Sequence, residues 1–332
     1  MSVEILPQPP QNCKQRNMTL ADRKNAAVKM AARLIEIGYV KRGERMKQCM
    51  DRIAFAVCSS CGKTRITQTY LCRDRLCPVC AAGRARKHWW EMIRAAEVSN
   101  NFGGNRIAHL GLTIRNCKPK DLEHTLLRMS TAFKRCQQRK YWRENILGYA
   151  RRLEITYNAE KRTMHPHYHV LLVISSSATD NLQMIGSRIA REWQTALQVS
   201  YLPIYDIVEA YSNKTDNPAD KLIGAYAEMS KYMVKPFEVL GIPNKSHFEI
   251  LVRAVSGFRI ASYGGIIKQA RKLAGITDAD DDNAVDVEIN CCDNAEIVHK
   301  TAQWALGKWV VEAEGLVQTI IDPQEGFKEY HG

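Results

Sequence analysis

The chain has 332 residues, 45% of them hydrophobic and 25% charged, which is typical of a soluble protein with one large core or two domains. Its net charge of +13 and its pI near 9.2 favour a polyanionic partner, most simply nucleic acid. An anionic membrane would suit that charge too, but no basic amphipathic helix stands out. The longest apolar run is far too short to cross a bilayer and residues 1–10 hold no signal-peptide core, so we expect a cytoplasmic protein without membrane partners.

Residues 1–50 are interpreted as a loose polar tail followed by a basic helix. The helix is expected from Leu20 to Met46, rich in Ala, Lys and Arg, with a break at Gly38. A helix of this kind can contact DNA, but we favour a solvated helix face as its interpretation.

The cysteines predict a metal site. Eleven cysteines in a chain without a secretory signal argue against a disulfide framework. Two CxxC pairs, separated by fifteen residues, match a four-cysteine zinc ribbon. We therefore predict a small N-terminal zinc-ribbon-like module over residues 51–100, with a structural Zn²⁺ held by Cys58, Cys61, Cys77 and Cys80. Cys72 is interpreted as a bystander thiol, and reduced thiols without metal are the alternative. The cations beside the cysteines suit contacts to DNA phosphates; they are Arg73, Arg75, Arg84, Arg86 and Lys87.

Residues 101–275 are predicted to form an α+β domain. Hydrophobic periodicity gives a strand at 106–115, a helix at 122–140, two strands at 153–157 and 165–174, a helix at 185–197 and a strand at 201–208. This order is that of a split βαβ, ferredoxin-like layer with an antiparallel sheet. In the first strand, His109 is a candidate to line a site on this face, although we favour a hydrogen-bonded structural histidine, and Gly111 would allow another backbone or a substrate to approach closely.

The strand after His165 carries the strongest chemical signal. Side chains alternate along a strand, so His167 and His169 share one face while Tyr168 points to the core. A tight turn between the two neighbouring strands places Glu154 opposite His167. Two imidazoles and a carboxylate can bind one divalent cation with open positions, which indicates a catalytic site.

A helix capped by Asn217 is expected to end before Pro236. Glu228, Tyr232 and Lys235 recur at helical spacing on a stripe distinct from the apolar one. Beyond it, residues 276–332 are read as an acidic linker and a C-terminal segment that adds two strands or a short cap.

In this order, the motifs resemble the replication initiators of rolling-circle plasmids, which are HUH endonucleases. The motifs that carry the resemblance are His165–Leu171, with Leu153–Asn158 before them and Glu228–Lys235 after them. In addition, Cys72–Cys80 resembles the zinc region of the family, and Gly264-Gly265 resembles its C-terminal portion. The resemblance covers roughly residues 55 to 270. It identifies 101–275 as the HUH endonuclease domain, with a single catalytic tyrosine.

The resemblance implies a chemistry. Glu154, His167 and His169 would hold Mg²⁺ or Mn²⁺, and Tyr232 would attack single-stranded origin DNA to leave a 5′-phosphotyrosine and a 3′-OH primer. Lys235 or Lys231 would stabilise the phenolate, Lys231 would also contact the DNA, and Glu228 would assist a terminating hydrolysis. The expected partners are the plasmid double-strand origin, single-stranded at the nick in an extruded hairpin, and a host helicase and DNA polymerase.

Two alternatives remain open. A relaxase or transposase of the same superfamily would share the histidine pair and the tyrosine. A non-catalytic, zinc-stabilised DNA-binding regulator would use the histidine strand only structurally.

Overall fold

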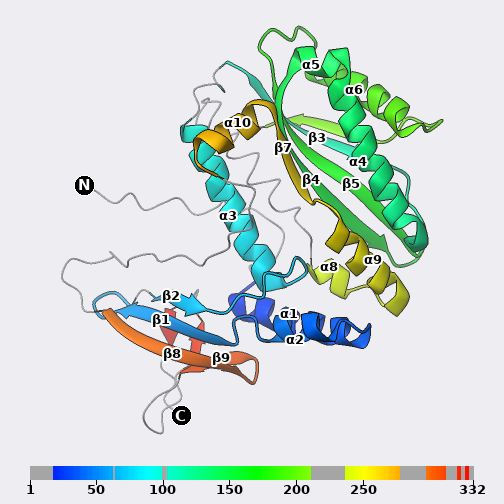
Figure 1. Ribbon diagram of the computed structural model, residues 1–332. Coiled ribbons are helices and arrows are strands. Elements are labelled where there is room, and N and C mark those ends of the chain that lie inside the picture. The colour runs from blue at the N-terminus through cyan, green and yellow to red at the C-terminus, as the bar shows by residue number, and fades with distance from the viewer. Residues whose placement is uncertain are drawn as a thin grey trace. The chain divides into compact units, whose positions relative to one another are not determined.

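The computed structural model describes residues 18–62, 64–98, 102, 104–210, 236–276, 297–311, 320–322 and 326–328. The chain divides into two compact units (Figure 1). The cysteine unit comprises residues 12–83 and 280–332, and the histidine unit comprises residues 84–279 together with 1–11. Helices combine with an antiparallel sheet in each, which confirms the expected α+β class.

The histidine unit is built on a five-stranded antiparallel sheet with the strand order β6-β3-β5-β4-β7. The bounds are β3 Arg106–Thr113, β4 Ile146–Asn158, β5 Thr163–Ile174, β6 Tyr205–Glu209 and β7 Ala261–Gly264. In chain order, β3, α4, β4, β5, α6 and β6 follow the expected sequence of strand, helix, two strands, helix and strand. The edge strand β7 and a much longer β4 are additions to that expectation.

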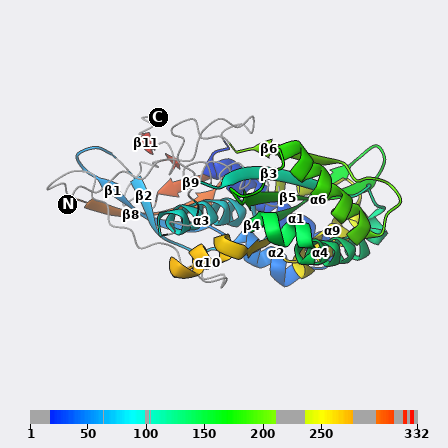
Figure 2. The same ribbon diagram turned by 90° about the horizontal axis from the view of Figure 1, so that it is seen from above.

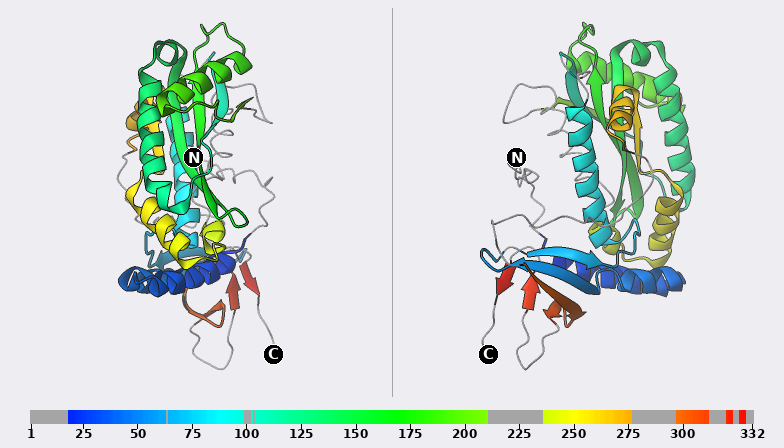
Figure 3. Two further views of the ribbon diagram at one scale, coloured as in Figure 1. Left: turned by 90° about the vertical axis from the view of Figure 1, so that its right-hand side faces the viewer. Right: turned by 60° about the vertical axis from the view of Figure 1, so that its left-hand side comes forward.

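One face of this sheet is covered by α4 (Leu122–Gln138) and α6 (Leu182–Leu197), which lie along it in Figures 2 and 3. The predicted apolar stripe of α4 is buried as expected. Tyr168 of β5 points toward these helices, with ring centroids 5.7 Å from Phe133 and 6.0 Å from Trp193, and is only 2% exposed. The core-facing assignment of Tyr168 is therefore confirmed.

The opposite face is covered at one end by the later part of α3 (Pro78–Glu97) and by α10 (Gly265–Leu273). Met92 and Ala96 of α3 and Ile267 of α10 pack in one cluster with Leu171 and Val173 of β5. The other helices in the described part of this unit are α5 Lys140–Asn145, α8 Pro236–Leu240, α9 Lys245–Gly257 and the short 3₁₀ helix Pro119–Asp121. Polar side chains occupy the other end of this face.

The glycine pair that joins β7 to α10 has a steric reason. Gly265 has φ +57°, and a Cβ there would collide with the Leu147 carbonyl oxygen. A Cβ on Gly264 would collide with the Tyr149 ring. Only glycine allows β7 and α10 to approach β4 this closely.

The cysteine unit joins segments from both ends of the described chain. Its six-stranded antiparallel sheet has the order β11-β10-β9-β8-β1-β2. The strands are β1 Arg52–Cys58, β2 Thr64–Thr69, β8 Ile297–Ala305, β9 Lys308–Val311, β10 Ile320–Asp322 and β11 Gly326–Lys328. The sequence analysis treated 1–50, 51–100 and 276–332 as separate stretches, whereas every residue of β1 pairs with a residue of β8. Such a pairing between segments far apart in sequence leaves no local signal.

Two helices precede this sheet, α1 (Leu20–Glu36) and α2 (Val40–Lys47). Thr19 and Asp22 form a capping box at the start of α1. The break expected at Gly38 is confirmed, since this residue has φ +91° between the two helices. None of the helices in the described parts of the chain is both long and apolar enough to cross a membrane.

Candidate functional site

Glu154, His167 and His169 meet on the polar part of the histidine-unit sheet. β4 and β5 pair so that Glu154 lies directly opposite His167, which is the register predicted from side-chain alternation. Glu154 Oε2 lies 3.0 Å from His167 Nε2 and 2.7 Å from His169 Nε2, and the two Nε2 atoms are 3.0 Å apart. Three potential ligand atoms thus converge.

A divalent cation fits this arrangement. Ligands at adjacent corners of an octahedron with metal–ligand bonds of 2.0–2.1 Å lie about 2.9 Å apart. The observed separations, 2.7 to 3.0 Å, agree with this value. Three ligands on one triangular face leave the opposite positions open for water or a substrate oxygen. Imidazole ligands favour Mn²⁺ over Mg²⁺, which prefers oxygen.

The ring of His169 is held from behind by a third histidine. His109 of β3 places its Nε2 atom 3.2 Å from His169 Nδ1, the nitrogen that faces away from Glu154. Gly111 pairs with His169 across β3 and β5, and the atoms nearest to a Cβ at this position would belong to Asp206 of β6. His109 therefore contacts a site residue directly, beyond the structural role that the sequence suggested. His109 lies two residues before Gly111 and therefore on the same face of β3, which was the signal available in the sequence.

His165 extends the same row of side chains. Its ring stacks on His167 with centroids 5.2 Å apart and planes 29° from parallel. Burial lowers the pKa of His165, and the neighbouring His167 lowers it further. Sequence analysis did not assign His165 to the site, although it alternates in phase with His167 and His169.

A polar cluster joins α3 and α10. Glu91 Oε2 accepts a hydrogen bond from Arg271 Nη1 at 2.9 Å and lies 3.1 Å from His88 Nδ1. Burial lowers the pKa of His88 more strongly than Glu91 raises it. Although burial opposes it, His88 and then Arg271 hold the pKa of Glu91 below its ordinary value. His88 and Arg271 therefore hold the Glu91 carboxylate in place.

The second group of potential ligands consists of four buried thiols, Cys49, Cys72, Cys77 and Cys80. Their sulfur atoms lie 3.5 Å (Cys49–Cys80), 3.7 Å (Cys72–Cys80) and 3.7 Å (Cys77–Cys49) apart. Sulfurs bound tetrahedrally to one zinc at 2.3 Å are separated by about 3.8 Å, so the cluster fits Zn²⁺. Hydrogen bonds from Cys49 and the other thiols lower the pKa of Cys80, whereas contact with the other cysteines raises the pKa values of Cys49 and Cys77.

Comparison with known proteins shows the family of the chain. A family model described as Replication protein, Rep_1, matches residues 63–311. The chain belongs to the replication protein family. This confirms the resemblance to rolling-circle plasmid initiators that the motifs predicted.

Individual relatives support the same assignment. "Protein rep" of Streptococcus pneumoniae serotype 2 (strain D39 / NCTC 7466) is 30% identical over 79% of this chain and 82% of its own length. "Protein rep" of Bacillus amyloliquefaciens is 31% identical over 75% and 78%, respectively. "Protein rep" of Lentilactobacillus hilgardii is 29% identical over 93% of this chain and 98% of its own length. No solved structure gives a significant match.

The structure corrects the cysteine set predicted from the spacing of the two CxxC pairs. Cys77 and Cys80 belong to the cluster, but Cys49 and Cys72 take the places expected for Cys58 and Cys61. Cys58 ends β1, a strand of seven residues that begins at Arg52, so Cys58 lies about 20 Å along the strand from its first residue. Cys61 is exposed in the turn after β1. The signal for Cys72 was its position five residues before Cys77; Cys49 had no local signal.

The remaining expected site residues are only partly described. Arg73 and Arg86 are exposed, and Arg75, Arg84 and Lys87 are half-buried. The predicted nucleophile Tyr232 and its companions Glu228, Lys231 and Lys235 lie outside the described residues.

Proposed function

We propose that this protein initiates rolling-circle plasmid replication by nicking origin DNA at the Glu154–His167–His169 site. The observation that carries the proposal is the convergence of one carboxylate and two imidazoles to within 3.0 Å, in a member of the replication protein family. Metal-dependent cleavage of a phosphodiester needs such a partly open ligand set.

The histidine unit is proposed to be a ferredoxin-like HUH nuclease core. Its strand order β6-β3-β5-β4, with α4 and α6 on one face, supports this assignment. In this interpretation His167 and His169 are the HUH pair, and Tyr168 between them anchors β5 to the helices.

The proposed nucleophile is Tyr232. Its phenolate oxygen would attack the scissile phosphorus, forming a tyrosine–phosphate bond while the bond to the 3′ oxygen breaks and a 3′-OH primer is released. Glu154, His167 and His169 would hold a divalent cation, which would polarise a phosphate oxygen. A phenol loses its proton at about pH 10, so Lys231 and Lys235 are proposed to stabilise the phenolate by their positive charge.

Glu228 is proposed to act at the end of a replication round. On a helix it would lie one turn before Tyr232, on the same stripe. A carboxylate there can take a proton from the water that attacks the second phosphodiester. Termination would then be hydrolytic and release the enzyme.

The cysteine cluster is proposed to bind a structural Zn²⁺. Its four buried thiols leave no open position for a substrate, which is the property of a structural site. Arg73, Arg75, Arg84, Arg86 and Lys87 are proposed to contact DNA phosphates, with the double-strand origin as the DNA partner. A host helicase and DNA polymerase would extend the released 3′ end.

The test is cleavage of labelled single-stranded candidate origin DNA by the full chain, with Mn²⁺, with Mg²⁺ and with chelator. We expect metal-dependent nicking and a covalent protein–DNA species. Tyr232→Phe should lose both and still bind DNA, while the control Tyr226→Phe should keep both. A wild-type protein that binds origin DNA but never cleaves it would favour a non-catalytic regulator. Cleavage by Tyr232→Phe would place the nucleophile elsewhere.

A further inference from the structure

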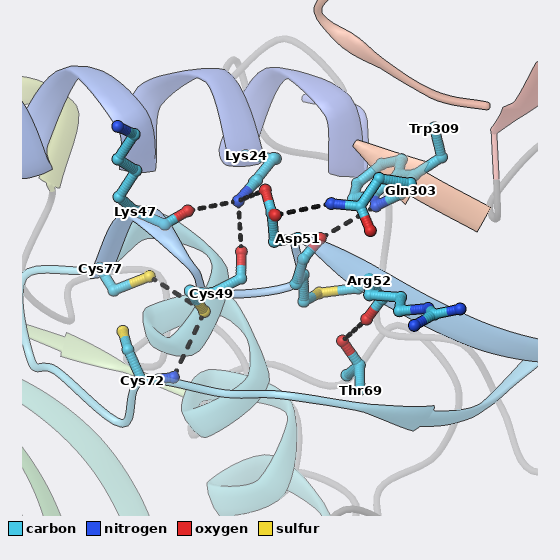
Figure 4. A network of polar contacts seen from close by, with 11 residues as sticks. Lys24, Lys47, Cys49, Asp51, Arg52, Thr69, Cys72, Cys77, Gln303 and Trp309 are labelled. Atoms are coloured by element: carbon cyan, nitrogen blue, oxygen red, sulfur yellow. Dashed lines mark hydrogen bonds and ion pairs between the residues drawn. The ribbon is translucent and has the colours of Figure 1, made fainter. Parts of the chain in front are cut away.

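Lys24 of α1 is a fully buried lysine, with 0% of its surface exposed. Its Nζ atom donates hydrogen bonds to the Lys47 carbonyl at 2.7 Å and the Cys49 carbonyl at 2.8 Å, and lies 3.4 Å from Asp51 Oδ1 (Figure 4). An ammonium has three N–H donors, and each has an acceptor here. A buried charge has a high free-energy cost unless it is paired and hydrogen-bonded, as it is here.

The three acceptors all belong to one short segment. Lys47 is the last residue of α2, so its carbonyl has no helical partner and lies at the negative end of the helix dipole. Cys49 belongs to the thiol cluster. Lys24 thus fixes the segment 47–51, which presents the one cluster cysteine that is distant in sequence from the other three.

The same segment holds the β8–β9 hairpin. Trp309 Nε1 donates to the Met50 carbonyl at 2.9 Å, and Gln303 Nε2 donates to Asp51 Oδ2 at 2.7 Å. The Trp304 amide donates to the Asp51 carbonyl at 2.7 Å. Met50 itself has φ 53°, a left-handed conformation that a non-glycine residue adopts only when its surroundings hold it there.

The positive charge of Lys24 has a second role, which is to balance the negative charge of the thiol cluster when it binds a metal. Four thiolates and one divalent cation carry a net charge of −2, which is unfavourable in a buried site unless a cation lies nearby. Burial lowers the pKa of Lys24, whereas Asp51 and then the nearby Cys49 and Cys77 raise it. Among the described residues, Lys24 is the one lysine that is fully buried.

We propose that Lys24 is the positioning residue and counter-cation of the Cys49–Cys72–Cys77–Cys80 metal centre, and that it links metal binding to closure of the β8–β9 hairpin. Metal occupancy, the docking of α1 and the docking of the hairpin then form one linked equilibrium. This inference rests on the zinc site proposed above, but it does not depend on DNA nicking.

The first test compares Lys24→Met with Lys29→Met, a control that removes an exposed lysine from the same helix. Zinc affinity is measured by competition with a chelator. Loss of a group that orients a metal ligand weakens metal binding by about 10- to 100-fold, and we expect this for Lys24→Met alone. Equal zinc affinity in both variants would overturn the role of Lys24. A wild-type chain that binds no zinc would instead refute the metal assignment itself.

The second test uses only the wild-type chain, so it tests the proposed link to the hairpin even if Lys24→Met fails to fold. Hydrogen exchange is followed in the wild-type chain before and after zinc removal. The amides of Trp304 and Met50, which donate to Asp51 and Tyr70 carbonyls, should lose protection. The Leu153 amide, which donates to the Ile260 carbonyl in the histidine unit, should keep it. Unchanged protection of Trp304 after zinc removal would overturn the proposed link to the hairpin.

Discussion

Glu154 on β4 and His167 on β5 face each other across paired strands, with Oε2 and Nε2 3.0 Å apart. Neighbouring side chains on β5 point to the other face, where Tyr168 is buried. Along β5, the histidines that form the site therefore flank a tyrosine that stabilises the fold.

This alternation predicts opposite effects for adjacent substitutions. His167→Ala should abolish nicking and leave thermal unfolding nearly unchanged, since its side chain lies at the proposed metal site and not in the apolar core. Tyr168→Ala should lower the free energy of unfolding by about 3–5 kcal/mol, because it removes a ring packed against Phe133 and Trp193. Nicking assays and urea unfolding check the two halves. Full activity in His167→Ala would contradict the site.

His109 should affect the cation requirement. His109→Leu removes the group that contacts His169 Nδ1, so the His169 ring loses its orientation. We expect the Mn²⁺ concentration for half-maximal nicking to rise by about 10- to 100-fold. His109→Gln, which retains hydrogen-bonding groups, should recover part of this loss. If nicking depends on Mn²⁺ identically in all three proteins, His109 does not position His169.

The cysteine set predicts which thiols hold zinc. Cys49→Ser or Cys72→Ser should reduce zinc from about one per chain and destabilise the cysteine unit, because each removes one of four ligands. Cys61→Ser should retain zinc, since this exposed residue lies outside the cluster. Metal analysis of the purified variants decides between the two sets. Zinc lost from Cys61→Ser and kept in Cys49→Ser would restore the ribbon predicted from the CxxC pairs.

Glu228 and Tyr232 are predicted to act in separate steps. Tyr232→Phe should give neither a nick nor an adduct, because the nucleophilic oxygen is absent. Glu228→Gln should still form the covalent species but should fail in the terminating hydrolysis, so that the adduct persists. A gel that resolves adduct from free nicked DNA measures both. Loss of the first nick in Glu228→Gln would show that the two-step assignment is wrong.

His88 should make stability depend on pH. Burial lowers its pKa from 6.5 in the folded chain, so below that value the unfolded chain binds a proton that the folded chain does not. Stability should therefore fall between about pH 7.5 and 5.5, and His88→Gln should reduce that fall. His124→Gln, at an exposed position on α4, is the control and should behave as wild type. Thermal unfolding across this range provides the measurement.

Local patterns were enough to predict much of the histidine unit. Alternation in β4 and β5 defined both the register at Glu154 and the burial of Tyr168. The cysteine unit was less predictable, because its contacts join residues far apart in sequence. Cys49 lies 23 residues before Cys72, and Trp309 contacts Met50 across 259 positions, so neither spacing forms a recognisable motif. Lys24 appeared as one more cation on a basic helix, since its burial depends on the segment 47–51.

The pairing of β1 with β8 also sets an order of events during synthesis. Cys58 and its partner Ile297 are separated by about 240 residues. At 5–20 residues per second, a ribosome needs roughly 12 to 48 s to add them. All five strands of the histidine unit are made within that interval, so this unit is able to fold on the ribosome while β1 still lacks a neighbour on one edge. Translation that stops before β8 would therefore release a chain with its Glu–His–His strands complete and an open sheet edge, which favours its aggregation and removal.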